Sequence, residues 1–143
     1  MTADETTAPR TTPYAANLRA RYVGNSVDAM SPGRMIVALY DRLLLDLERA
    51  RQAIEEHNPA TAHECLLHAQ SIVAELHDSL DCEQWAAGGG LKSLYVFVLG
   101  ELVTANVDKS ADRIASCHAL LAPLRDAWRE AAGIVPSVSG GTA

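Results

Sequence analysis

Histidine, cysteine and acidic side chains are the residues of this chain that could bind a metal or catalyse a reaction. The chain has 5 histidines, 3 cysteines and 18 acidic residues. A di-iron site in a helical bundle uses glutamate and histidine three residues apart, and no glutamate here precedes a histidine at that spacing. Glu64 and His68 are four residues apart, which is typical of a solvated pair on one helix face. We therefore expect no metal and no cofactor.

The cysteines and one glycine-rich segment are equally poor candidates for chemistry. Cys65, Cys82 and Cys117 form no C-x-x-C pair, so neither a zinc site nor a redox motif is indicated. The segment GGGLKS lacks the G-x-x-x-x-G-K-[ST] spacing of a phosphate-binding loop, and no strand precedes it. We interpret it as a linker and expect that the protein is not an enzyme.

Composition excludes further classes of protein. The 143 residues are 48% hydrophobic and carry a formal net charge of −6. One domain is expected at this length, and the acidic charge argues against binding nucleic acid or anionic lipid. No run approaches the roughly 18 uninterrupted apolar residues of a membrane-spanning helix, and the N-terminus lacks the pattern of a signal peptide. A cytoplasmic protein without membrane insertion is expected.

Four segments have the apolar spacing of helices, and no segment is a convincing strand. Ser31 has the type of a helix N-cap, with Pro32 at the first helical position, and Asn58-Pro59 repeats this signal for the second helix. The glycines of residues 86–90 interrupt the pattern, so the third helix is expected over about 91–107. The fourth is expected over about 110–132.

The short connections between most of these helices favour antiparallel neighbours. The predicted fold is all-α, an antiparallel up-down four-helix bundle with a flexible N-terminal arm and disordered tails. The expected divisions are a disordered tail at 1–17, the arm at 18–30, the bundle at 31–132 and a second disordered tail at 133–143.

Two of the helices carry more apolar residues than one buried stripe needs. The third, LKSLYVFVLGELVTANV, is apolar on nearly every side, and the first has Val37, Leu44 and Leu45 in addition to its main stripe. A bundle helix needs about three apolar positions in seven, and exposed apolar patches commonly mark interaction sites. The surplus has three explanations: binding of a partner, self-association, or packing against the terminal segments.

Several motifs, in order, resemble one known family. YVGNSVDAMSPGRMIVALYD resembles the Y-x-x-N-x-V-x-x-x-S-P…L-Y-D opening of the flagellin-specific export chaperones (FliS). IVAELHDSLDCE, LKSLYVFVLGELVTANVDKS and LLAPLRDAWREA are similar to three later motifs of that family. The resemblance covers about residues 20–132, and the order and spacing of the motifs are more specific than any one of them.

The resemblance implies a function. Members of this family are small cytosolic helical chaperones that bind the disordered C-terminal segment of flagellin, prevent its premature polymerisation and assist flagellar type III export. The expected partners are therefore the flagellin C-terminal segment and, behind it, the flagellar export gate. The alternative is a homo-oligomeric helical adaptor without a flagellin client, whose surplus apolar faces pair with a second copy as a homodimer.

The residues expected to contact flagellin combine these motifs with the surplus apolar positions. Tyr22 is expected in an arm over the binding groove, with stapling of the first helix as the alternative. Asp41 is expected to hold the arm or a loop by hydrogen bonds. For Asn106 and Trp128, a structural role and a binding role both stay open. The full predicted set is Tyr22, Asn25, Val27, Tyr40, Leu94, Tyr95, Val96, Phe97, Leu99, Val103, Asn106, Leu120, Leu124 and Trp128.

Overall fold

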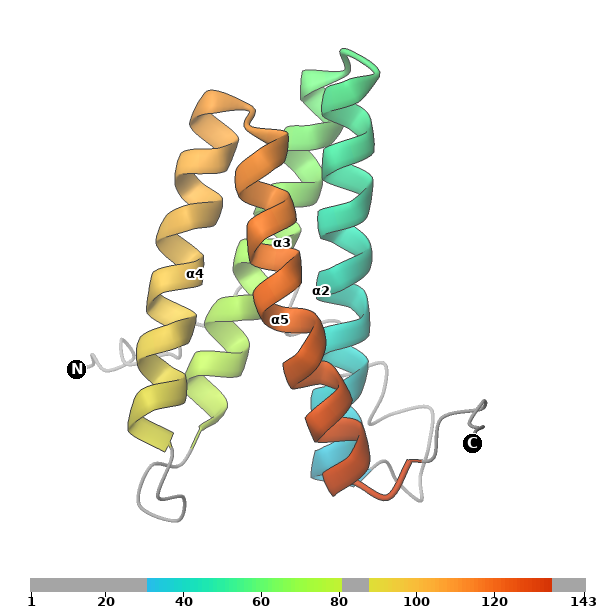
Figure 1. Ribbon diagram of the computed structural model, residues 1–143, viewed down its shortest axis with the longest axis vertical. Helices are drawn as coiled ribbons and strands as arrows, with labels where there is room; N and C mark the ends of the chain where they lie inside the picture. Colours follow the sequence, from blue (N-terminus) through green and yellow to red (C-terminus); the bar gives the residue numbers. More distant parts are fainter. Residues whose placement is uncertain (1–30, 81–87, 135–143) are drawn as a thin grey trace, which may run out of the picture.

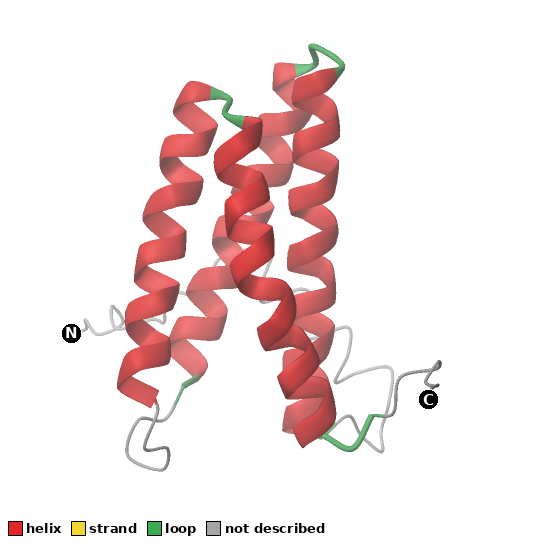
Figure 2. Cartoon of the chain, in the orientation of Figure 1, coloured by secondary structure: helices red, strands yellow, loops and turns green. Residues whose placement is uncertain are grey.

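The computed structural model describes residues 31–80 and 88–134, and these residues form four α-helices. Their bounds are α2 Pro32–Glu55, α3 Pro59–Ser79, α4 Gly88–Asp108 and α5 Ala111–Ala131. Figure 2 shows the described part of the chain as helices joined by short loops. The prediction of an all-α fold is confirmed.

Side-chain caps fix the starts of three helices. The hydroxyl of Ser31 accepts a hydrogen bond from the backbone N–H of Arg34 at the start of α2. The side chains of Asn58 and Ser110 accept equivalent bonds at the starts of α3 and α5. Each cap satisfies a backbone donor that has no partner within its helix. The predicted caps at Ser31 and Asn58 are confirmed.

The glycine segment before α4 behaves differently from the expectation. The third helix was expected from about Leu91, with the glycines as a linker, but α4 begins at Gly88 and includes Gly89 and Gly90. Glycine lowers helix stability without forbidding the helical conformation. The interpretation of GGGLKS as a linker is therefore wrong, since all six residues are helical.

The helices form a four-cornered antiparallel bundle. Each packs against two neighbours in the cyclic order α2, α3, α4 and α5, and Figure 1 shows them running alternately up and down. The helices α2 and α4 thus occupy opposite corners. In the same view α4 and α5 lie close together at the turn that joins them and diverge toward the other end.

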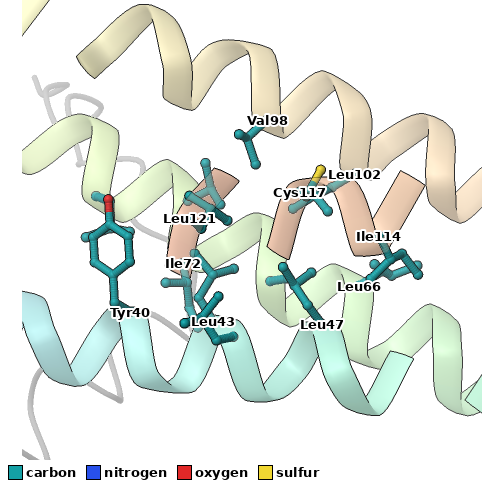
Figure 3. Packing of buried hydrophobic residues seen from close by; sticks show 14 of the residues in the cluster. Tyr40, Leu43, Leu47, Leu66, Ile72, Val98, Leu102, Ile114, Cys117 and Leu121 are labelled. Carbon is teal, nitrogen blue, oxygen red and sulfur yellow. The ribbon is translucent and has the colours of Figure 1, made fainter. Parts of the chain in front are cut away.

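The core lies along the bundle axis and receives side chains from all four helices. In Figure 3 the labelled side chains point into one interior, among them Leu43 of α2, Ile72 of α3, Val98 of α4 and Leu121 of α5. All four are fully buried. Burial of such side chains is the main stabilising contribution to a bundle of this kind.

The surplus on the first helix is smaller than its sequence indicates. Val37 and Leu44 were expected outside the main stripe, but both are buried, and only Leu45 is exposed. Because α2 packs on both α3 and α5, its buried face is wider than a single stripe. The expectation of a surplus holds here for Leu45 alone.

Candidate binding surface

The helix α4 carries two apolar stripes on opposite sides. One stripe faces the core and contains the buried Tyr95, Val98, Leu102 and Ala105. Residues on the other side are exposed, and this second set, which we call the outer stripe, consists of Val96, Gly100, Val103 and Val107. In a helix of 3.6 residues per turn the two sets point in nearly opposite directions.

A second exposed apolar surface lies where α4 meets α5. Glu101 of α4 accepts a hydrogen bond at 2.8 Å from Arg113 of α5, so this side of α4 faces α5. Phe97 lies one turn before Glu101, and Leu120 lies two turns after Arg113, which places both beside the same contact. Phe97 is 54% exposed and Leu120 is 43% exposed.

Three half-buried side chains continue this surface toward the end where α4 and α5 diverge. Leu94 lies one turn before Phe97, and Leu124 and Trp128 lie one and two turns after Leu120. All three pack against the core while remaining partly accessible. We call Leu94, Phe97, Leu120, Leu124 and Trp128 together the α4/α5 surface. The fold thus gathers five of the predicted residues into one apolar strip.

The other predicted residues of α4 lie elsewhere. Val96 and Val103 belong to the outer stripe and are 59% and 46% exposed. Leu99 is half-buried against the core. Asn106 faces α3, where its side-chain nitrogen lies 2.9 Å from Nδ1 of His63. The prediction of three exposed positions at Val96, Phe97 and Val103 is confirmed, whereas Leu99 is less exposed than expected.

Tyr40 and Tyr95 are core residues. Their side chains are 0% and 1% exposed, and their hydroxyl oxygens lie 2.6 Å apart. Burial raises the pKa of both hydroxyls, and Trp128 interacts with both and opposes that shift. Neither tyrosine contributes surface to a bound client, so their place in a flagellin contact stays a prediction without support from their burial.

Tyr22, Asn25 and Val27 lie outside the described residues, as do the expected arm and most of the expected tails. Asp41 is described, and it makes no contact of the expected kind with a loop. Its carboxylate accepts hydrogen bonds from Arg125 at 3.2 Å and from Arg129 at 3.5 Å. The role of Asp41 is thus structural, as expected, but it joins α2 to α5.

Sequence reasoning missed two exposed apolar residues. Leu67 of α3 is 45% exposed and Val107 of α4 is 77% exposed. Leu67 falls one position outside the regular stripe of its helix, and Val107 follows Val96 and Val103 at helical spacing. Both signals were present in the sequence but were not used.

Buried charge lies on the opposite side of the bundle, between α2 and α3. Asp46 and Glu75 are buried, and Asp46 accepts a hydrogen bond at 3.1 Å from Arg42. Burial raises the pKa of Asp46, while the positive charges of Arg42, His68 and Arg49 oppose this. Within residues 31–80 and 88–134, no three His, Cys, Asp or Glu side chains are grouped as a metal site would need.

The apolar character of α4 also bears on membranes. By length and composition alone α4 could cross a bilayer, although its sequence has no uninterrupted apolar run. The same helix supplies Tyr95, Val98 and Leu102 to the core and is joined to α5 by the Glu101–Arg113 ion pair. Packing within the bundle therefore accounts for one of its two apolar sides.

Comparison with known proteins agrees with this arrangement. The model of a family described as "Flagellar protein FliS" matches residues 14–135. The chain is 30% identical over 119 residues to the flagellar secretion chaperone FliS of Bacillus subtilis strain 168, which covers 83% of this chain and 85% of that protein. It is also 30% identical over 113 residues to the flagellar secretion chaperone FliS of Salmonella typhimurium strain LT2, which covers 76% and 82% respectively. This chain belongs to the FliS family of flagellar proteins.

Proposed function

We propose that this protein is a cytoplasmic flagellar export chaperone that binds the C-terminal segment of flagellin on the α4/α5 surface. Its role is to keep that segment from polymerising early and to deliver flagellin to the type III export apparatus. Membership of the FliS family supports the general role, since both relatives are named as flagellar secretion chaperones. Flagellin as the client rests on the motifs that resemble flagellin-specific chaperones.

One observation carries the choice of surface. Phe97 and Leu120 are large exposed apolar side chains on two neighbouring helices, at a contact fixed by the Glu101–Arg113 ion pair. An amphipathic helix can place its apolar face between two such helices. A client helix laid along this contact would cover both side chains and reach the half-buried Leu94, Leu124 and Trp128.

The physical basis of the proposed binding is apolar burial. Each Å² of apolar surface removed from water contributes about 25 cal/mol, and part of this offsets the cost of ordering a disordered client. A client that folds on binding can cover a long surface even when its affinity per unit area is low. Binding of this kind also hides the apolar face that flagellin would use to polymerise.

Calorimetric titration with flagellin, intact and lacking its C-terminal segment, tests the proposal. We expect one-to-one binding with a negative heat-capacity change for intact flagellin and loss of binding for the truncated form. Phe97→Asp and Leu120→Asp should each weaken binding by about tenfold or more. Leu45→Asp is the matched control, because Leu45 is also exposed and apolar but lies on α2.

The outcomes separate the client from the surface. If intact flagellin does not bind, flagellin is not the client. If flagellin binds equally well to the wild type, Phe97→Asp and Leu120→Asp, the client is right and the α4/α5 surface is wrong. If Leu45→Asp weakens binding as much as the other two variants, the effect is not specific to this surface.

A further inference from the structure

The outer stripe of α4 is separate from both the core and the α4/α5 surface. Val96, Val103 and Val107 are 59%, 46% and 77% exposed, and they point away from the side of α4 that faces the core. Glu101, which marks the side facing α5, is not part of this stripe. The proposed client site therefore leaves these valines uncovered.

The spacing of the outer stripe is that of a coiled-coil seam. Val96, Gly100, Val103 and Val107 follow one another at intervals of four, three and four residues, which is the alternation of a and d positions in a heptad. Such a narrow seam fits a second helix with the same spacing. The outer stripe of another copy of α4 has that spacing by definition.

Gly100 gives the seam a specific shape. A glycine inside a helix is less stabilising than alanine, and no atom of a neighbouring side chain or helix lies within 4 Å of the position a Cβ would occupy. The packing of this chain therefore gives no reason for glycine here. Between Val96 and Val103, the missing side chain leaves a hole that can receive a side chain from a second helix.

The distribution of charge favours a second copy in one orientation. From Lys92 to Asp108 the only other charged residue is Glu101, which is paired with Arg113. The outer stripe is thus uncharged, although the chain carries a net charge of −6. An antiparallel pair of α4 helices places the end with Lys92 beside the end with Asp108, and opposes the two helix dipoles. A parallel pair would bring like charges together.

We propose that two copies of this protein associate through antiparallel pairing of their outer stripes. Val103 of each copy occupies the hole at Gly100 of the other, and this register places Val96 beside Val107 of the second copy. The contact spans about 16 Å, at 1.5 Å per residue over eleven residue steps. A contact this small belongs to the weak class of interfaces, so the dimer forms reversibly at high protein concentration.

Sedimentation velocity of the full chain over a wide range of concentrations tests this. The wild type should show a reversible monomer–dimer equilibrium, and Val103→Glu should weaken it by about tenfold or more. Gly100→Leu is the sharper variant. It adds apolar surface and should strengthen nonspecific association, but it fills the hole and should weaken the proposed pairing to a similar degree. Circular dichroism checks that each variant keeps its helical content.

Leu120→Glu is the control, because it places a charge on the α4/α5 surface and should leave the dimer unchanged. Three results would overturn the proposal: a wild type that stays monomeric at every concentration, a Val103→Glu variant that dimerises as well as the wild type, or a Gly100→Leu variant that dimerises better. None of these results depends on flagellin, so the proposed client and the proposed dimer can fail separately.

Discussion

The hydroxyl groups of Tyr40 and Tyr95 form a hydrogen bond of 2.6 Å across the bundle. Tyr40 belongs to α2 and Tyr95 to α4, which occupy opposite corners, so the bond joins two helices that are not neighbours. The rings are tilted by 52° with centroids 6.5 Å apart. Because Trp128 of α5 interacts with both hydroxyls, three helices meet at this point beneath the α4/α5 surface.

Tyr40→Phe and Tyr95→Phe should each destabilise the protein by about 1–2 kcal/mol, because each leaves a buried hydroxyl without its tyrosine partner. The double variant should lose less than the sum of the two, since it removes both polar groups. Urea unfolding of the wild type and the three variants measures this cycle. Strictly additive losses would contradict a direct hydrogen bond between the two hydroxyls.

Helix starts were the part of the fold most easily predicted from the sequence. Ser31 and Asn58 cap their helices through local hydrogen bonds, so residue type and position suffice to predict them. The start of α4 was not predictable in this way. Gly88–Gly90 have low helix propensity, yet the helix includes them, and local propensity is a weak prior wherever the rest of the fold decides.

The candidate site was predictable only in part, because periodicity on α4 gives two stripes and does not say which faces inward. Val96, Phe97 and Val103 were correctly expected to be exposed. Tyr95 was expected to contact flagellin but is buried, and its partner Tyr40 lies 55 residues away in the chain. Such a long-range contact leaves no trace in the spacing of either helix.

Trp128 should report client binding directly. The chain has two tryptophans, Trp85 and Trp128, so in a Trp85→Phe background only Trp128 emits. A client helix on the α4/α5 surface would cover its accessible part, and we expect the emission maximum to move to shorter wavelength when flagellin is added. The control is the Trp85→Phe chain with Phe97→Asp, in which the shift should require a much higher flagellin concentration. Binding without a shift would place the client away from Trp128.

Asp46 should make stability depend on pH. Burial raises the pKa of its carboxyl group, so the folded protein binds this proton more tightly than the unfolded chain does. The contribution of Asp46 to the free energy of unfolding is therefore greatest at low pH. It falls as pH rises from the model value of 3.8 through the raised pKa of the folded state. Above that window the ionised group is held at a cost.

Asp46→Asn should remove this part of the pH dependence. The difference in unfolding free energy between Asp46→Asn and the wild type should shift in favour of the variant as pH increases through the window, and then level off. Urea unfolding at several pH values measures the difference, in which the titration of distant groups cancels. A difference that moves in favour of the wild type would mean that the attraction of Arg42, His68 and Arg49 exceeds the cost of burial.

Asp41 should contribute little to stability despite its two arginine partners. Its side chain is 44% exposed, and exposed ion pairs are typically worth less than about 1 kcal/mol. Asp41→Asn should therefore destabilise the protein by less than about 1 kcal/mol, and less again at high salt, where the charges are screened. Thermal unfolding at low and high ionic strength tests this. A larger loss that salt leaves unchanged would mean that Asp41 acts through packing.

Gly89 and Gly90 offer the opposite kind of change. Both are helical residues of α4, and an added Cβ would meet nothing within 4 Å at either position. Gly89→Ala and Gly90→Ala should each stabilise the protein by roughly 0.4–1 kcal/mol, because alanine loses less conformational entropy on folding. Urea unfolding measures the gain, and the same substitution at Gly133 is the control. Gly133 has a φ of 77°, so alanine there is strained and should destabilise. If Gly89→Ala and Gly90→Ala are also destabilising, the helical start of α4 at Gly88 is wrong.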